Sequence, residues 1–385
     1  MTPGARIAAA IAILDQIGSG LAAEQALTRW ARASRFAGAK DRAAIRDHVF
    51  DVLRQRLSLG NGDGRALMVQ LALRSGWDVA ALFSGDGHAP APVTETERNT
   101  TLALTDAARV DVPEWLWPIW QRSLGPDATE TARAQQARAD VFLRVNLRRG
   151  TIKDAQDALM ADDIATMPVA RCETALRVTE NARRLKTSTA FTSGLVELQD
   201  TASQLAMARL DLSQCNRILD YCAGGGGKSL ALADRTQAEI VAHDIDPART
   251  ADIAPRAKRA GAKVKVCTTQ QLTGQGRFDL VLCDAPCSGS GTWRRAPEAK
   301  WRLTLETLES YAAKQLSVLQ SAESFVAKDG HLAYATCSVL DVENDGAIAA
   351  FLQASPQWEL ISRWQRVPDS DGDGFYLAVM KRKAT

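Results

Sequence analysis

The chain lacks several features that would place it in a familiar class. No stretch of its 385 residues approaches the roughly 20 consecutive apolar residues that a membrane-spanning helix needs. The seven cysteines form no Cys-x-x-Cys pair, and the four histidines are scattered without the spacing of metal ligands. We therefore expect no membrane partner and no metal site. An odd number of cysteines also argues against a disulfide framework and favours a reducing cytoplasm.

The chain also lacks a large excess of charge of either sign. The 47 basic and 45 acidic residues leave a formal net charge of +2, which excludes a strongly basic nucleic-acid tail but not a local basic groove. The short apolar stretch at residues 7–14 lacks the charged start and cleavage pattern of a signal peptide. The hydrophobic content of 46% supports real cores, and the length predicts two or three domains.

The first third of the chain is helical in pattern. Apolar residues recur at three- and four-residue spacing, and Asp41 is a plausible helix N-cap. The cluster of Trp115, Trp117 and Trp120 is interpreted as core. Helices are predicted at residues 6–16, 22–33, 41–57, 65–74, 94–108 and 113–124.

The pattern changes after this helical part. A small mixed segment follows, with strands expected at 142–147 and 195–198 and a helix at 151–160. From residue 202 onward, strands and helices alternate, and this order predicts an α/β fold with a doubly wound, mostly parallel sheet. Its strands are expected at residues 217–221, 239–243, 263–267, 278–283, 331–335, 358–361 and 375–380.

Two cysteines stand where predicted strands end. Cys287 lies in Asp284-Ala-Pro-Cys-Ser-Gly-Ser-Gly291, and Cys337 lies in Ala335-Thr-Cys-Ser-Val339. Loops at the carboxyl ends of parallel strands are where such sheets place ligands and chemistry. Two thiols at one sheet edge indicate covalent chemistry. For a lone cysteine, the simpler interpretation as a small buried apolar residue would be favoured.

A glycine-rich loop follows the first strand of this sheet. It reads Asp220-Tyr-Cys-Ala-Gly-Gly-Gly-Gly-Lys228, and Asp244 follows the next strand. Glycine allows close approach to a ligand, the following helix N-terminus favours negative charge, and an acid at this distance suits a ribose. The loop fits neither the strict dinucleotide pattern nor a Walker loop. A methyl donor therefore competes well with NAD and is favoured over ATP.

These motifs together resemble the RsmB/Nop/Sun family of S-adenosylmethionine-dependent RNA (cytosine-5) methyltransferases. The segments 294–301, Val342-Glu-Asn344 and Gly372-Asp-Gly-Phe-Tyr376 also resemble that family. Upstream, residues 40–54 resemble the NusB-like helical domain of the bacterial RsmB branch. The resemblance covers nearly the whole chain. It implies a NusB-like RNA-binding domain at 1–135, a small α+β linker subdomain at 136–200 and a Rossmann-like class I methyltransferase domain at 201–385.

The resemblance also implies residue roles. Cys337 would bond to carbon 6 of a cytosine, Cys287 would release the RNA, and Asp284 would support the base. S-adenosyl-L-methionine is the implied cofactor. The family's loop usually has Ala and Pro where Gly224 and Gly225 stand, and an adenine-binding acid where this chain has Thr268 or Thr269. The residues implied to hold the cofactor are Asp220, Cys222, Ala223, Gly224, Gly225, Gly226, Gly227, Lys228, Asp244, Ile245, Arg249, Thr268 and Asp284.

The segment after the first cysteine suggests an RNA surface. Residues 292–302 interleave four basic residues and two tryptophans with one acid, and such a segment can neutralise phosphates and stack on an unpaired base. The alternative is a solvated loop whose tryptophans pack inward. The expected RNA contacts are Lys228, Arg294, Arg295, Lys300 and Trp301.

Several functional hypotheses remain open from the sequence. The bacterial branch points to 16S ribosomal RNA by resemblance, and transfer RNA is an alternative substrate. A methyltransferase acting on a protein or small molecule would explain the loop but not the two cysteines. A NusB-like RNA-binding or assembly protein with an inactive methyltransferase domain is a third hypothesis. We expect a cytoplasmic monomer.

Overall fold

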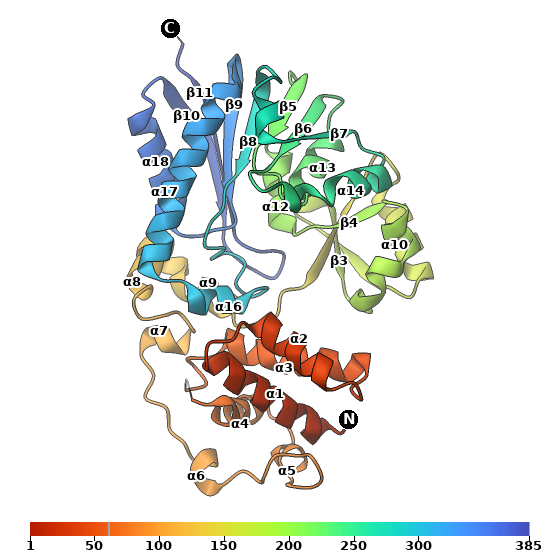
Figure 1. The fold of residues 1–385 in the computed structure, drawn as a ribbon, viewed down its shortest axis with the longest axis vertical. Helices are drawn as coiled ribbons and strands as arrows, with labels where there is room; N and C mark the ends of the chain where they lie inside the picture. Colours follow the sequence, from red (N-terminus) through yellow and green to blue (C-terminus); the bar gives the residue numbers. More distant parts are fainter. Residues whose placement is uncertain (61, 385) are drawn as a thin grey trace. The chain divides into compact units, whose positions relative to one another are not determined.

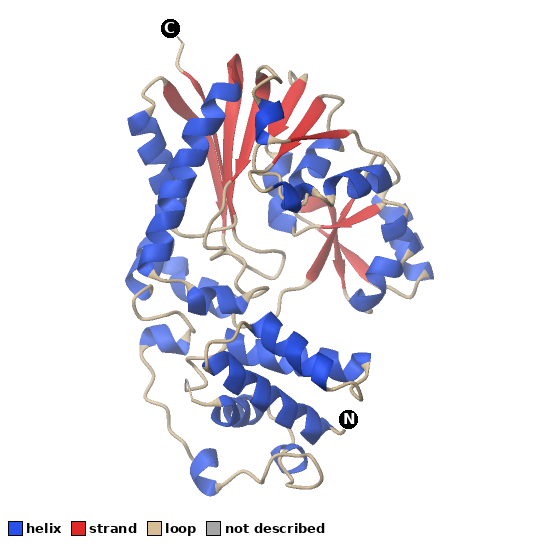
Figure 2. Ribbon diagram, viewed as in Figure 1, coloured by secondary structure: helices blue, strands red, loops and turns tan. Residues whose placement is uncertain are grey.

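The computed structural model describes residues 1–60 and 62–384, which form two compact units (Figures 1 and 2). Residues 1–138 and 293–303 form the first, which we call the helical unit. Residues 139–292, together with the chain from 304 to its end, form the second, which we call the sheet unit. A short segment from the C-terminal half of the chain thus belongs to the helical unit. Each unit is described by itself.

The helical unit is built on amphipathic helices around one apolar core. Ile7, Ala10, Ile13 and Leu14 of the first helix are buried there, at the three- and four-residue spacing that the sequence predicts. Of the three clustered tryptophans, Trp120 is buried and Trp115 is exposed, so the core interpretation holds for Trp120 but not for Trp115. The helices are α1 (Pro3–Gly18), α2 (Ala23–Ala33), α3 (Ala39–Arg54), α4 (Gly64–Arg74), α5 (Val79–Leu82), α6 (Glu95–Arg98), α7 (Asp106–Arg109), α8 (Trp117–Leu124), α9 (Ala128–Ala134) and α16 (Pro297–Arg302).

Two predictions about these helices are wrong. Gly38, not Asp41, is the N-cap of α3, and the Asp41 carboxylate reaches back from the first turn to accept from the Gly38 backbone N–H at 3.1 Å. The single helix predicted at 94–108 is two short ones, α6 and α7. Each begins at its own threonine cap, Thr94 and Thr105, whose hydroxyl accepts a backbone N–H three residues on.

A small antiparallel sheet begins the sheet unit. Its strand order is β2-β3-β1-β4, formed by β1 (Val141–Val145), β2 (Thr166–Val169), β3 (Cys172–Val178) and β4 (Val196–Leu198). The helices α10 (Ile152–Ala161), α11 (Thr189–Thr192) and α12 (Thr201–Ala208) lie in the same stretch of chain. The sequence predicts β1, β4 and α10 but misses β2 and β3. β2 is short, half exposed and contains Pro168, so it lacks a strand's alternation.

A seven-stranded sheet forms the rest of the sheet unit, in the order β10-β11-β9-β8-β5-β6-β7. The strands β5 to β9 pair in parallel, whereas β11 pairs antiparallel with both β9 and β10 at one end of the sheet. This confirms the predicted doubly wound, mostly parallel α/β sheet. The strands are β5 (Arg217–Asp220), β6 (Glu239–His243), β7 (Val264–Cys267), β8 (Phe278–Asp284), β9 (Val326–Thr336), β10 (Trp358–Arg366) and β11 (Phe375–Arg382).

Helices cover both faces of this sheet. Leu219 packs with α17 (Leu305–Ala322) and α18 (Asp345–Ala354), whereas its neighbour Ile218 packs with α12 and α13 (Gly227–Ala233). Alternate residues of a strand point to opposite faces, so these helix pairs lie on opposite sides (Figure 1). Two further helices, α14 (Ile253–Ala260) and α15 (Thr269–Leu272), follow β6 and β7.

The order of the strands marks where a ligand should bind. The chain moves outward from β5 through β6 to β7 and then returns to β8 on the other side of β5. Such a reversal opens a crevice at the carboxyl ends of the central strands, which is the usual ligand site of this architecture. The predicted catalytic and cofactor residues lie at or just after the ends of β5, β6, β7, β8 and β9, so they lie along this edge.

Candidate functional site

The glycine-rich loop joins β5 to α13 and turns sharply. Gly224 and Gly226 have φ angles of +49° and +77°, in the left-handed region. A Cβ atom at Gly226 would lie 2.9 Å from Cγ1 of Ile253. The Ala223 N–H donates to the His243 carbonyl at 2.8 Å, which ties the loop to the end of β6. The loop therefore brings backbone N–H groups to the sheet edge in a conformation that favours glycine.

Two buried acids flank this loop. Asp220 is fully buried; its Oδ2 accepts from Ser229 Oγ at 2.6 Å, but its Oδ1 has no hydrogen-bond partner. Burial raises the pKa of Asp220 to about 7. The buried Asp244 accepts from the Gly224 N–H at 2.9 Å, while the next residue, Ile245, is 86% exposed. An orphaned carboxyl oxygen, a second acid and an exposed apolar side chain fit a polar, nucleoside-containing cofactor.

The outer predicted cofactor residues are also placed at this edge. Arg249 forms an ion pair with Asp244 at 3.2 Å. Thr268 is exposed and caps α15 by accepting from the Gln271 N–H, and the neighbouring Thr269 hydroxyl bonds His243 at 2.9 Å. Cys222 is partly buried, and burial raises its pKa far above the usual value of a thiol. These residues provide polar and apolar surface for a ligand.

An ion pair stands between the loop and β8. The Lys228 ammonium donates to Asp284 Oδ2 at 2.6 Å and lies 5.2 Å from the centre of the Phe375 ring. Burial acts to lower the pKa of Lys228, but the Asp284 carboxylate outweighs it and the pKa is raised. Lys228 is therefore a fixed positive charge at the sheet edge.

The two predicted cysteines are in contact. The Sγ atoms of Cys287 and Cys337 lie 3.5 Å apart although 50 residues separate them in the chain. The hydrogen bond from Cys287 lowers the pKa of Cys337 against the opposing effect of burial, and Lys228 lowers it further. The same hydrogen bond, with burial, raises the pKa of Cys287 well above its usual value. Cys337 is thus the thiol of the pair that ionises more readily.

Cys337 differs in this respect from every other cysteine of the chain. Burial raises the pKa of each thiol outside the pair, so those side chains stay protonated and inert near neutral pH. These thiols belong to Cys172, Cys215, Cys222, Cys267 and Cys283.

The segment expected to bind RNA packs into the helical unit. Arg294 and Lys300 are 5% and 2% exposed, and Arg295 is exposed. The indole N–H of Trp301 donates to the Leu53 carbonyl at 2.6 Å, and Trp293 stacks on Trp120 with ring centres 5.7 Å apart. This packing matches the alternative in which the tryptophans turn inward. Buried as they are, Arg294 and Lys300 cannot reach a phosphate unless this packing opens.

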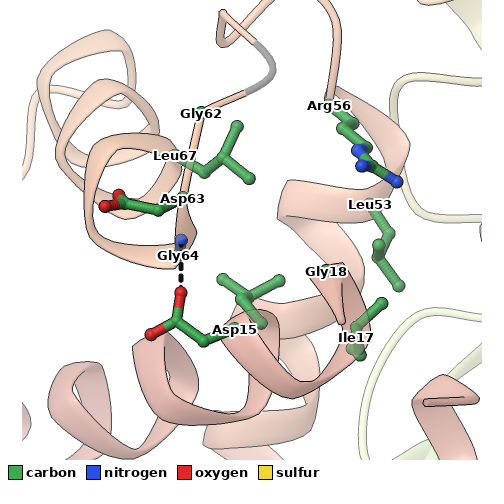
Figure 3. Close-up of a pocket in the computed structure, with 10 residues that line it drawn as sticks. Asp15, Ile17, Gly18, Leu53, Arg56, Gly62, Asp63, Gly64 and Leu67 are labelled. Atoms are coloured by element: carbon green, nitrogen blue, oxygen red, sulfur yellow. Dashed lines mark hydrogen bonds between the residues drawn. The ribbon is translucent and has the colours of Figure 1, made fainter. Parts of the chain in front are cut away.

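A pocket elsewhere in the helical unit has no catalytic arrangement. It measures about 310 Å³, and Figure 3 shows it among Asp15, Arg56, Asp63 and neighbouring apolar residues. Asp15 accepts from the Gly64 N–H at 2.8 Å, and Asp63 accepts from the Ala66 N–H at 2.8 Å as the N-cap of α4. Both carboxylates are therefore engaged in holding helix ends.

Two further features were sought in residues 1–60 and 62–384. No group of three or more histidine, cysteine, aspartate or glutamate side chains is placed to hold a metal ion there. No helix in this part of the chain is long and apolar enough to cross a membrane.

The fold and this site define a class of protein. A doubly wound sheet with a glycine loop after its first strand, an acid after the second and ligand groups at the switch point is a Rossmann-like domain that binds a nucleoside-containing cofactor. The model of the 16S rRNA methyltransferase RsmB/F family matches residues 207–380. The model of the RsmF/B-like ferredoxin-like domain matches residues 112–183. The chain belongs to this family, whose methyl donor is S-adenosylmethionine.

Curated relatives agree with the family models. Proteins named ribosomal RNA small subunit methyltransferase B from Vibrio cholerae and Escherichia coli are each 32% identical over 291 residues, which is 72% of this chain and 67% of theirs. The same named protein from Citrobacter koseri is 32% identical over 294 residues, 72% of this chain and 68% of its own. The family resemblance predicted from the motifs is confirmed.

Solved structures share the fold. The crystal structure of PH0851 has a TM-score of 0.76 at 22% identity and covers 99% of both chains. The structure of NSun6 from Pyrococcus horikoshii with SFG has a TM-score of 0.61 at 16% identity, covering 71% of this chain and 99% of its own. At these identities the likeness concerns the fold. The likeness of the helical unit to NusB stays a prediction.

Proposed function

We propose that the protein methylates carbon 5 of a cytosine in 16S ribosomal RNA through a covalent bond between Cys337 and carbon 6. The observation that supports this most is the thiol pair. The Sγ atom of Cys337 lies 3.5 Å from that of Cys287, and the pKa of Cys337 is lowered. The charges of Lys228 and Asp284 both act on this thiol. A methyltransferase that acts on an already nucleophilic atom needs no such pair of thiols.

Carbon 5 of cytosine is a poor nucleophile, and the thiolate overcomes this. The Cys337 electron pair forms a bond to carbon 6, and the ring electrons that this addition displaces make carbon 5 able to attack a methyl group. S-adenosylmethionine supplies that methyl group as an electrophile. We assign to the Lys228–Asp284 ion pair the role of bonding the base edge and balancing the charge that develops on addition.

Release of the product requires a base. The proton on carbon 5 must leave, and its electrons must reform the ring double bond as the bond between carbon 6 and sulfur breaks. Once Cys337 is bonded to carbon, it no longer carries the negative charge that holds the proton on Cys287. Cys287 can then lose its own proton to solvent more easily, and as a thiolate it would accept the proton from carbon 5. We therefore assign Cys337 to attack and Cys287 to release.

The cofactor would be held by the loop and the two acids beside it. The loop N–H groups and the unpartnered Oδ1 of Asp220 provide polar contacts, and Asp244 suits a ribose hydroxyl pair. Ribosomal RNA is proposed because the matching relatives carry that substrate in their names. Transfer RNA is the alternative substrate.

Substitution of each thiol tests the mechanism. Cys337→Ala should abolish methylation, because no nucleophile remains. Cys287→Ala should accumulate a covalent protein–RNA adduct that survives a denaturing gel, because addition proceeds and release fails. Cys215→Ala, which changes a thiol on another part of the sheet unit, should behave as the wild type. Normal product release by Cys287→Ala would remove the role assigned to Cys287. An adduct that forms only when Cys287 is present would reverse the roles of the two cysteines.

The RNA substrate is identified by a different measurement. Bisulfite sequencing of ribosomal and transfer RNA from a deletion strain should show one or more 16S positions that lose methylation. Loss confined to transfer RNA would establish the alternative substrate. Titration calorimetry with S-adenosylmethionine tests the inactive-domain hypothesis, which requires that no binding is detected.

A further inference from the structure

A buried carboxylate joins the two cysteine loops. Glu343, in the 3-10 helix η5 (Asp341–Glu343), is fully buried and accepts four hydrogen bonds. Its Oε1 accepts from the Ser288 N–H at 2.7 Å and from Gln315 Nε2 at 3.2 Å. Its Oε2 accepts from the hydroxyls of Ser288 and Ser338, each at 2.5 Å. Ser288 follows Cys287 and Ser338 follows Cys337, so one side chain holds the residue next to each thiol.

Further bonds join the same loops directly. The hydroxyls of Ser290 and Ser338 are 2.8 Å apart, and Ser290 Oγ also accepts from the Val339 N–H at 2.9 Å. The Gly291 N–H donates to the Cys337 carbonyl at 2.9 Å. With these contacts, the Glu343 carboxylate lies in a polar network that spans both loops. Such a network holds the geometry of the groups that it satisfies, and one of its buried atoms, Gln315 Oε1, has no hydrogen-bond partner.

The charge of Glu343 is as informative as its contacts. Its four donors are neutral groups, so they stabilise the carboxylate without cancelling its charge. The negative charge raises the pKa of Cys287, after the larger effects of the Cys337 hydrogen bond and burial. Lys228, in contrast, lowers the pKa of Cys337. The thiol pair is therefore polarised between an anion that acts on Cys287 and a cation that acts on Cys337.

Other titratable groups also act on the pair. Asp284 raises the pKa of Cys337 and so opposes Lys228. Tyr311 of α17 and Tyr334 of β9 interact with Cys287 and Glu343, and burial raises the pKa of both, so both are neutral near pH 7. Of the two carboxylates, Glu343 raises the pKa of Cys287 and Asp284 raises that of Cys337.

We propose that Glu343 is a positioning residue that holds the two cysteine loops at contact distance and directs the negative charge of the thiol pair to Cys337. The catalytic role of Glu343 rests on the proposed function. Its effect on the position and charge of the two thiols can be measured on the protein without RNA. Without the carboxylate, the two thiols compete more equally for the proton, and the wrong one is more often the thiolate. The division of labour between the two cysteines thus depends on a residue that never touches substrate.

Alkylation of the protein without RNA tests this inference. In Glu343→Gln the amide oxygen can replace Oε1, and the amide N–H groups can face the two serine hydroxyls, which rotate to accept. The fold should therefore persist while the charge is lost. Iodoacetamide labelling, mapped by peptide mass spectrometry, should show the preference for Cys337 over Cys287 falling about tenfold, which corresponds to one pKa unit. The pair as a whole should ionise at lower pH, because an anion is gone.

Asp345→Asn is the matched control. It removes a carboxylate two residues away that bonds Tyr376 and Arg363 and neither cysteine loop, so the labelling preference should stay unchanged. In methylation assays, Glu343→Gln should lower kcat and leave KM for S-adenosylmethionine unchanged, and Glu343→Asp should partly restore kcat. An unchanged labelling preference in Glu343→Gln overturns the proposal. A shifted preference together with full methylation by Cys337→Ala would instead overturn the proposed function.

A separate observation concerns the exposed surface of α2. Residues 25–40 contain no acid, and Arg29, Arg32 and Arg35 are exposed. Phe36 beside them is 76% exposed, so most of its ring surface is open to a ligand. Glu24, Gln25, Thr28, Arg29, Arg32 and Ala33 line a shallow hollow on this helix. Its one acid, Glu24, forms an ion pair with Arg46 and not with Arg29 or Arg32.

We infer that the α2 surface, which consists of Arg29 and Arg32 of α2 with Arg35 and Phe36 of the turn after it, binds the phosphate backbone of RNA and stacks one unpaired base. Uncompensated arginines neutralise phosphates, and an exposed aromatic ring stacks on a base of any sequence. The proposed function supplies the nucleic acid. The α2 surface would supply an RNA contact outside the cofactor site. It belongs to the helical unit, in which Arg294 and Lys300, two of the RNA contacts that the sequence predicts, are buried.

The salt dependence of RNA binding tests this surface. With a single-stranded RNA, Arg29→Gln/Arg32→Gln should reduce the slope of log K against log salt by about 1.4, at roughly 0.7 per lost phosphate contact. The control Arg109→Gln/Arg133→Gln loses equal charge from exposed arginines that pair with Asp106 and Glu130. Phe36→Ser should weaken binding at least about fivefold. Equal slopes for the two double variants would overturn the inference. That result is expected if the α2 surface binds a partner other than RNA. Binding rather than methylation is measured, so the outcome is independent of the chemistry at Cys337.

Discussion

The thiol of Cys337 depends on the charge of Lys228. Lys228→Met keeps the length of the side chain but removes the cation and leaves Asp284 without its partner at 2.6 Å. Both changes disfavour the thiolate, because an attracting charge is lost and a repelling one is unpaired. The pKa of Cys337 should rise, and its alkylation rate near pH 7 should fall about tenfold or more, at one unit per factor of ten. A pH series of iodoacetamide labelling measures this. Lys228→Arg should retain most of the reactivity, and an unchanged pH profile in Lys228→Met would contradict the role of the charge.

Asp220 illustrates a conflict between stability and ligand binding. Burial raises its pKa from the ordinary 3.8 to about 7, so the folded state binds the proton more tightly than the unfolded state. The free energy of unfolding should therefore fall as pH rises from about 4 to about 7 and stay lower above that range. Asp220→Asn should be more stable than the wild type above pH 7, by up to a few kcal/mol, and equally stable below pH 4.

Thermal unfolding of the ligand-free protein across this pH range measures the effect on stability. The same variant should bind S-adenosylmethionine more weakly, because the unpartnered Oδ1 is the oxygen available to a ligand. A variant that loses stability at every pH would show that Asp220 is a structural residue.

At this scale the sequence identifies the residues that follow strands. Cys287, Cys337, Asp284 and Asp220 could be found because each stands at the end of a recognisable apolar run. Glu343 could not be assigned a role in the same way. It lies 55 residues from Ser288 and acts on Cys287 only through the folded chain. The segment Val342-Glu-Asn344 resembles the family, but the sequence does not show that Glu343 contacts the loop of Cys287.

The glycine loop is an element whose conformation restricts substitution unevenly. Gly226→Ala places a Cβ 2.9 Å from Ile253 at a positive φ, so the loop must move. Gly225→Ala meets only the end of the flexible Arg256 side chain at 3.2 Å, at a φ outside the positive range. We expect Gly226→Ala to weaken S-adenosylmethionine binding about tenfold, because distorting the left-handed residue costs on the order of 1–3 kcal/mol. Gly225→Ala should stay within about threefold of the wild type, since surface changes are usually within about 0.5 kcal/mol. Calorimetric titration of both variants separates the two positions, and equal losses would contradict this account of the loop.

Elements with a clear period were predicted well and irregular ones were not. β6 has the bounds 239–243 that the apolar pattern predicts. β9 begins at Val326, five residues before the predicted start, because Lys328, Asp329 and Gly330 hide the strand pattern. The predicted helix at 94–108 failed for the opposite reason: the apolar spacing outweighed two threonine caps and the Asn99-Thr-Thr101 stretch between them, whose residues disfavour a helix. Local caps and long-range pairing decided these boundaries.

At the scale of the whole chain, sequence order does not show which parts fold together. The chain leaves the sheet unit after Thr292, close to Cys287, and returns at Thr304, and the residues between belong to the helical unit. The basic and aromatic composition of this segment is compatible with an RNA surface or with packing. Only the long-range contacts, such as Trp301 with Leu53 and Trp293 with Trp120, distinguish the two.

Lys300 offers a test of how this segment contributes to the molecule. Burial lowers its pKa to about 8 from 10.5, so the folded state holds the proton less tightly than the unfolded state. The resulting cost is complete below pH 8 and disappears as pH rises through about 10.5, so stability should increase across that range. Lys300→Met fills similar volume without a charge. It should stabilise the helical unit near pH 7 by up to a few kcal/mol, and the difference should vanish at high pH.

Two further measurements decide between packing and RNA contact. Lys314→Met, which removes an exposed lysine of α17 that also lies near an aromatic ring, should leave stability unchanged. The affinity of Lys300→Met for RNA should equal that of the wild type, because a buried ammonium neutralises no phosphate. Thermal unfolding across pH and an RNA-binding titration give both results on the full chain. Weaker RNA binding without a gain in stability would restore Lys300 to the RNA surface that the sequence suggests, and would require this segment to leave the helical unit when RNA binds.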